Sequence, residues 1–164
     1  ELAAMLPLAA SGLVMGTGLF LLVQPVAPVE RLALPVTMLV NATLALPYLF
    51  RLLLPEALRL EADYARLAES LSLRGAARLR LLVLPRLARP LGFGTGLAAA
   101  LSMGDLGVIA LFAGERGVTL PLLVQRLTGA YRMEAAASAA LLLVGLSFAL
   151  FWLFDRWGAR HAAA

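Results

Sequence analysis

The sequence predicts an all-α membrane protein with about four transmembrane helices. Of its 164 residues, 62% are hydrophobic and the mean hydropathy is +0.88, whereas a soluble globular domain is about 45–50% apolar. The apolar residues also gather in long runs with very few charges, of the length that a helix needs to cross a bilayer. Composition and clustering together predict that lipid, not water, surrounds much of this chain.

Four apolar stretches are the expected spans, and they cover residues 2–23, 32–54, 91–112 and 135–154. As a helix, the first stretch would extend about 33 Å, enough for a hydrocarbon core of about 30 Å. We expect a kink in the second near Pro47, because proline removes a helical hydrogen bond. In the third, Gly92, Gly94 and Gly96 predict close packing against another helix, because small residues let two backbones approach.

Residues 55–89 differ from the spans, because they are charged while their leucines and alanines recur at helical spacing. This pattern predicts short amphipathic helices outside the hydrocarbon. Eight arginines lie between Arg51 and Arg89, against one in the loop at 24–31 and three in the loop at 113–132. The excess of positive charge places the 55–89 loop and the C-terminus in the cytoplasm.

The sequence carries no signal for catalysis or for a bound cofactor. It contains no cysteine, and its single histidine is His161, three residues from the end. We find no spacing of metal ligands and no pair of nucleophile and base. The glycines at 92–96 lack the Lys-Ser/Thr pair that follows a phosphate loop. We therefore expect neither an enzyme nor a metal or cofactor site, and no nucleic-acid partner.

The segment ARLAESLSLRGAARLRLLVLPRLARP, at residues 65–90, resembles the cytoplasmic coupling loop of ABC importer permeases. That loop follows the pattern E-A-A, three residues, G, nine residues, I, one residue, L-P. Aligned on Leu84 and Pro85, its glycine falls on Ser72, its isoleucine on Leu82 and the last alanine of its triplet on Ala68. The pattern predicts a helix, a break near residues 72–75, a second helix, the Leu-Pro pair and then a span.

Four further segments resemble the C-terminal half of the thiamine permease family of ABC importers. They are VNATLALPY (40–48), SLSLRGAARLR (70–80), SMGDLGVIALFAG (102–114) and TLPLLVQRLTGAYR (119–132). The resemblance covers about residues 1–157, and its most distinctive block is Gly-Asp-Leu-Gly-Val at 104–108. Iron(III) permeases have a comparable acidic block, so transport of iron(III) or another small solute remains an alternative.

The resemblance implies part of a type I importer permease fold. Residues 1–164 would then form one incomplete transmembrane domain of a multi-pass protein of the bacterial inner membrane. Its partners would be a cytoplasmic ATPase subunit, a periplasmic substrate-binding protein, the second permease half and the lipid bilayer. The residues implied in coupling to the ATPase are Ala68, Leu71, Ser72, Leu73, Arg74, Gly75, Ala76, Leu84 and Pro85.

Asn41 and Asp105 are candidates for lining the translocation pathway. A carboxylate within a span costs about 2.5–3.5 kcal/mol, so such groups usually face a cavity or a partner. The alternative for Asp105 is a cap on the turn at 106–112 or a pair with an arginine, and the alternative for Asn41 is a hydrogen bond between helices. A membrane enzyme or scaffold and a secondary transporter are the competing functions. An enzyme would need clustered acids or histidines facing the cytosol near the membrane, and a secondary transporter would not need the loop that ends in Leu84 and Pro85.

Overall fold

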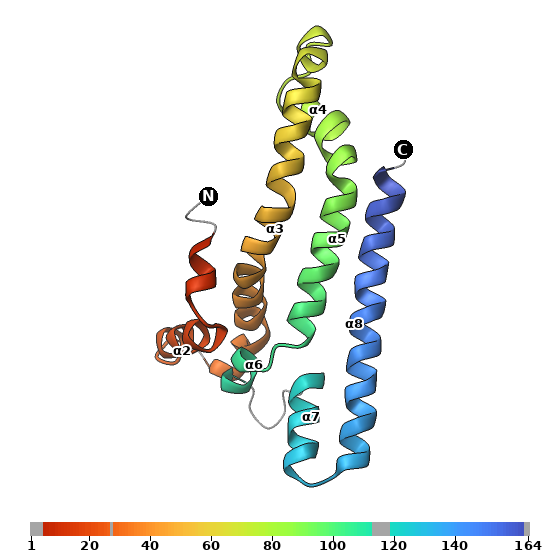
Figure 1. Cartoon of the computed structure of the whole chain (residues 1–164). Helices are drawn as coiled ribbons and strands as arrows, with labels where there is room; N and C mark the ends of the chain where they lie inside the picture. Colours follow the sequence, from red (N-terminus) through yellow and green to blue (C-terminus); the bar gives the residue numbers. More distant parts are fainter. Residues whose placement is uncertain (1–4, 27, 113–118, 163–164) are drawn as a thin grey trace. The chain divides into compact units, whose positions relative to one another are not determined.

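The computed structural model describes residues 5–26, 28–112 and 119–162, and it confirms the predicted all-α class. Every regular element in these ranges is a helix (Figure 1). In chain order they are the 3-10 helix η1 (Leu6–Ala9), α2 (Gly12–Val23), α3 (Val29–Ser70), α4 (Gly75–Arg78), the π-helix η2 (Leu79–Val83), α5 (Leu84–Met103), α6 (Gly107–Phe112), α7 (Leu120–Gly129) and α8 (Met133–Ala162).

The prediction of one continuous helix over residues 2–23 is wrong. Within the described part of this stretch, η1 ends at Ala9 and α2 begins at Gly12. The side chain of Ser11 caps α2 by accepting a hydrogen bond from the backbone N–H of Val14 at 3.2 Å. Twelve helical residues extend only about 18 Å, which is shorter than a hydrocarbon core of about 30 Å.

The second predicted span lies within α3, which continues far beyond it. The helix passes through Pro47 and Pro55 and ends only at Ser70, so the expectation of a separate short helix after residue 54 is wrong. Residues 56–70 are rich in alanine, leucine, glutamate and arginine, all strong helix formers, and they extend the helix beyond its apolar part.

The third predicted span, 91–112, is divided into two helices. The helix α5 begins early, at Leu84, and ends at Met103, and α6 follows only at Gly107. The fourth predicted span lies within α8, which runs eight residues further, to Ala162. Among the described residues, α3 and α8 are long and apolar enough to cross a membrane, and α2 is a shorter apolar helix.

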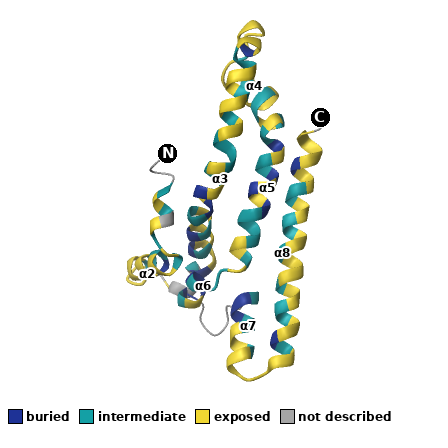
Figure 2. Cartoon of the chain, viewed as in Figure 1, coloured by how far each residue is buried: buried dark blue, intermediate teal, exposed yellow. Residues whose placement is uncertain are grey.

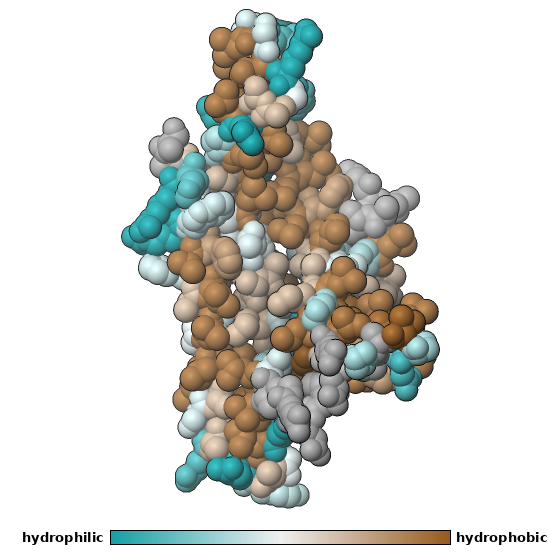
Figure 3. Space-filling model, turned by 180° about the vertical axis from the view of Figure 1, so that it is seen from behind, coloured by the Kyte–Doolittle hydropathy of each residue, from teal (hydrophilic) through white to brown (hydrophobic). Residues whose placement is uncertain are grey.

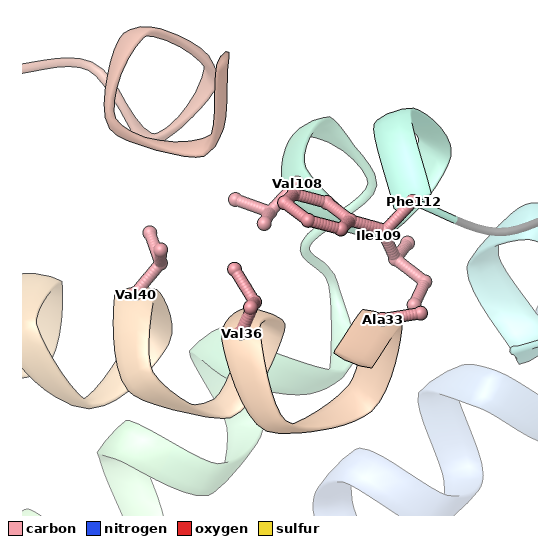
Figure 4. Close-up of a cluster of buried hydrophobic side chains, with 6 residues drawn as sticks. All are labelled: Ala33, Val36, Val40, Val108, Ile109 and Phe112. Carbon is pink, nitrogen blue, oxygen red and sulfur yellow. The ribbon is translucent and has the colours of Figure 1, made fainter. Parts of the chain in front are cut away.

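The chain divides into two compact units, and the divisions fall inside α3, α5 and α8. Unit 1 comprises residues 1–47 and 98–149. Its core joins Ala33, Val36 and Val40 of α3 to three side chains of α6 (Figure 4), which are Val108, Ile109 and Phe112. Side chains of α2 complete this core, and the ring of Phe20 meets Phe112 edge-on at a centroid distance of 5.4 Å.

Unit 2 comprises residues 48–97 and 150–164, and glycines bring its helices together. A Cβ atom added to Gly92 of α5 would lie 2.6 Å from the Cα atom of Gly158 in α8, and one added to Gly96 would lie 2.9 Å from the carbonyl oxygen of Phe151. The opposite face of α5 meets α3, where a Cβ on Gly94 would lie 2.5 Å from Leu49. The packing role predicted for Gly92, Gly94 and Gly96 is confirmed.

Apolar side chains are exposed over much of the surface of the described residues. Along α8 they include Leu141 at 74% and Phe148 at 71% exposure, and most of this helix is exposed in Figure 2. Broad apolar areas cover the face drawn in Figure 3. Such extended apolar surface is unfavourable in water and suits contact with lipid or with neighbouring helices.

Replacing Gly158 by alanine tests the contact between α5 and α8. We expect a loss of about 1–3 kcal/mol in stability, because the added methyl group meets backbone atoms, which cannot move aside cheaply. The midpoint of thermal unfolding in detergent micelles measures this effect. Gly145→Ala in the same helix is the matched control, since nothing lies within 4 Å of its Cβ position. An equal midpoint for both variants would contradict the close contact.

Candidate functional site

The helix α3 ends in a Schellman turn, and this turn reverses the chain. The backbone N–H of Ser72 donates to the carbonyl oxygen of Glu69 at 2.9 Å, and that of Leu73 donates to the carbonyl oxygen of Ala68 at 2.8 Å. This pair of bonds requires a left-handed residue between the helix and the exit, and Ser72 has φ of 53°. The turn therefore satisfies two terminal carbonyl groups of α3 at the cost of strain at a serine.

The strained residue is the one on which the coupling-loop pattern places its glycine. Only glycine adopts a left-handed conformation without a steric penalty from Cβ. Gly75, three residues later, is also left-handed, with φ of 51°. The backbone at residue 72 thus favours the glycine of the pattern, which supports the alignment on Leu84 and Pro85.

The chain returns from the turn along a nearly continuous helical path. Arg74 precedes α4 in an extended conformation, and α4, η2 and α5 follow one another without a break. At the end of η2, the N–H of Leu84 donates to the carbonyl oxygen of Leu79, one residue further back than in an α-helix. Pro85 has no N–H to donate, and the wider π turn directly before it lets the helix continue.

Two side-chain contacts fix the register of this hairpin. Arg78 of α4 donates to Glu61 of α3 in an ion pair, and Arg86 of α5 donates to the hydroxyl of Tyr64. The guanidinium of Arg86 also lies over the Tyr64 ring, 4.3 Å from its centroid. The hydrogen bond and charge of Arg78 lower the pKa of Glu61, and the Arg78 pKa is raised in turn. Exposed pairs stabilise little, so their main effect here is positional.

Most of the predicted coupling residues occupy residues 71–76, which form the tip of the hairpin, and the start of the returning helix. Leu71 is 60% exposed, and Ser72, Arg74, Gly75 and Ala76 are exposed as well. Three predicted residues are less exposed: Ala68 is buried, and Leu73 and Pro85 are half-buried. Leu84 is 45% exposed. The tip therefore offers a leucine beside a cation, a surface suited to binding another protein.

Asn41 and Asp105 both have structural contacts within unit 1. The side-chain amide of Asn41 donates to the hydroxyl of Ser102 at 2.9 Å and so connects α3 to α5. Asp105 accepts a hydrogen bond from the N–H of Gly107 at 3.0 Å and so begins α6. These contacts match the alternatives of hydrogen bonding between helices and capping. A pathway role stays a prediction for both residues.

The second carboxylate oxygen of Asp105 is buried and has no hydrogen-bond partner among the residues described. Within the same ranges, no group of three His, Cys, Asp or Glu side chains is placed to hold a metal ion.

Sequence reasoning missed a second turn of the same kind. In unit 1, the backbone N–H of Tyr131 donates to the carbonyl oxygen of Thr128 at 3.0 Å, and that of Arg132 donates to the carbonyl oxygen of Leu127 at 2.9 Å. Tyr131 has φ of 58° and is 86% exposed. A glycine at the left-handed position would have signalled this turn, but Gly129 lies two residues too early.

The predicted resemblance to thiamine permeases is confirmed by comparison with curated proteins. The chain is 38% identical to the thiamine transport system permease protein of Salmonella typhimurium over 162 residues, which are 99% of this chain and 30% of that protein. It is 35% identical to the Escherichia coli protein of the same name over 98% of this chain and 30% of that protein. The Brucella abortus protein gives 38% over 93% of this chain and 28% of its own length.

Each alignment covers nearly the whole of this chain but only a minor part of the relative. The chain spans about 30% of the length of the curated relatives that it matches. No family model and no solved structure matches the chain. The alignment with the Salmonella typhimurium protein covers 99% of this chain. The activity of the longer proteins comes to this chain only as a proposal.

Replacing Ser72 by glycine tests the left-handed turn. We expect Ser72→Gly to raise stability by about 1 kcal/mol, because glycine removes the Cβ strain at this φ. Ser70→Gly is the matched control and should lower stability, since Ser70 is helical and its hydroxyl donates to the carbonyl oxygen of Leu67 at 2.8 Å. Thermal unfolding in micelles measures both, and equal destabilisation by both variants would contradict the turn.

Proposed function

We propose that this chain forms part of the permease subunit of an ATP-driven importer, and that the imported solute is thiamine. Three relatives with 35–38% identity carry the name thiamine transport system permease. On this proposal, residues 1–164 belong to one permease transmembrane domain, and a second permease half completes the translocation pathway. Iron(III) or another small solute remains the alternative cargo.

The hairpin tip is proposed as the dock for the ATPase. The observation that carries this proposal is the left-handed turn at Ser72, at the position where the coupling-loop pattern has its glycine. The turn presents Leu71 and Arg74 together at the surface. A leucine can fill an apolar pocket of the ATPase, and an arginine can pair with acidic groups around that pocket.

The helices of unit 2 provide a means of transmitting movement from this dock. From Gly75 the chain is helical through α4, η2 and α5, so a push on the tip acts along one element. The side-chain contacts from α3 and the glycine contact with α8 resist bending of that element. Closely packed helices move as rigid bodies when a partner displaces them, and this is the kind of motion that alternating access needs.

The distribution of arginine supports a cytoplasmic position for the 55–89 loop and the C-terminus. Both belong to unit 2, which holds ten of the fourteen arginines and five of the ten acidic residues. Gly158 near the end of α8 contacts Ala88 and Gly92 of α5, so the two segments also lie side by side within that unit. Positive charge is enriched on the cytoplasmic side of bacterial membrane proteins. The periplasmic binding protein would approach from the opposite side.

Charge reversal at the tip tests the proposed dock. We expect the double variant Leu71→Asp, Arg74→Glu in the parent permease to retain less than a tenth of the ATPase that the wild type co-purifies. The substitutions replace the apolar contact and the cation by acids, which an acidic pocket rim repels. Quantitative recovery of the ATPase on tagged permease measures the effect, together with uptake of labelled thiamine.

Tyr131→Asp is the matched control, because it alters an exposed side chain in the other turn of the same type. It should leave ATPase recovery unchanged. Full recovery of the ATPase by the tip variant would place the dock elsewhere. If the ATPase is retained at the tip but iron(III) rather than thiamine is taken up, the permease proposal stands and the proposed cargo is wrong.

A further inference from the structure

A groove in unit 2 lies between the beginning of α5 and the end of α8. Its volume is about 900 Å³. The lining includes Leu81, Leu84 and Ala88 on one side and Trp157 on the other, with Arg86 and His161 as its polar members. The groove lies next to the contact of Gly92 with Gly158, which holds the two helices in place. The proposed coupling mechanism assigns no ligand to this space.

The surroundings of the groove are strongly basic. Residues 79–91 and 155–162 contain five arginines, at positions 80, 86, 89, 156 and 160, and a single acid, Asp155. Arg86 itself lines the groove, while Arg89 and Arg160 adjoin lining residues in sequence and form no ion pair within the part of the chain described. A site with these charges favours an anion.

The apolar part of the groove continues onto the exposed surface of α8. Trp152 is 58% exposed, Leu153 is 55% exposed and Trp157 is 51% exposed. Tryptophans near the end of an apolar helix are typical of the level of the lipid headgroups. An occupant of the groove can therefore have an apolar tail that extends along α8 and an anionic head beside the arginines. A free phosphate would make no contact with the leucines of the groove. An acidic peptide would not need the apolar surface that continues along α8.

We propose that this groove binds an anionic phospholipid. The phosphate would lie beside Arg86, with Arg89 and Arg160 within reach of the headgroup, and one acyl chain would cover Leu81, Leu84 and Trp157. Basic pockets between helices are known to hold lipid headgroups in this manner. A lipid in this position would fill the space between α5 and α8 and would make the rigidity of unit 2 dependent on the lipids around it. The proposal does not depend on the transported solute or on the ATPase.

Quenching of tryptophan fluorescence by brominated lipids tests the proposal. The chain contains two tryptophans, so Trp152→Phe leaves Trp157 as the reporter in the groove. The protein is reconstituted into bilayers that contain the same mole fraction of brominated phosphatidylglycerol or brominated phosphatidylcholine. We expect the anionic lipid to quench Trp157 at a concentration lower by about fivefold for each arginine that contributes.

Two double variants separate specific binding from general attraction of anionic lipid. Arg89→Gln with Arg160→Gln should abolish the preference, and among the residues that the structure describes neither arginine has a side-chain partner that its loss would leave unpaired. Arg59→Gln with Arg66→Gln removes the same charge from α3 and should leave the preference intact. Circular dichroism checks that both variants keep their helices.

Three results would overturn the proposal. Equal quenching by the two brominated lipids would show only the general lipid annulus. Absence of quenching by either lipid would show that protein covers the groove. A preference that both double variants reduce equally would show attraction by the net charge of unit 2 rather than by the groove.

Discussion

The close approach of α5 and α8 at Gly92 and Gly158 is the constraint on which the rest of unit 2 depends. With no side chain at either position, the two backbones come so near that an added Cβ would lie within 3 Å of the other helix. Two further glycines extend the effect along α5, where Gly96 meets Phe151 and Gly94 admits a leucine of α3. The contact between α5 and α8 is thereby made largely by backbone atoms, whereas leucine side chains of α3 fill the space beside Gly94. Dispersion between closely packed atoms, rather than the expulsion of water, drives such association in lipid.

The hairpin consists of α3 and the returning helices α4, η2 and α5. It extends from this packed region and depends on it for its direction. The turn at Ser72 determines which residues of the two helical arms of the hairpin face each other. The pairing of Glu61 with Arg78, and of Tyr64 with Arg86, follows from that register. A tip supported in this way can transmit a push, whereas a flexible loop would absorb it. The groove beside the glycine contact adds a position at which the proposed lipid would stiffen the contact between α5 and α8.

The sequence predicted the helical class, the packing glycines and the order of elements around the turn, because each depends on local composition or spacing. The predicted helix boundaries were wrong where one or two residues interrupt the helix within an apolar run. Ser11 begins a new helix inside the first predicted span, and Gly104 with Asp105 ends α5 inside the third. Hydropathy averages over such positions and cannot detect them. The contacts of Tyr64 and Glu61 were also beyond prediction, since they require the register that a serine in a left-handed conformation imposes.

On the proposed function, the tip, α5 and the end of α8 move as one body when the ATPase acts. Distances between spin labels measure this directly, and Arg66 of α3 and Arg160 of α8 are exposed positions for the labels in the assembled transporter. The account predicts the same distance distribution with and without bound ATP, while distances from Arg66 to the ATPase change. A shift in the distance between Arg66 and Arg160 on ATP binding would contradict it, because the force would then bend unit 2 instead of moving it.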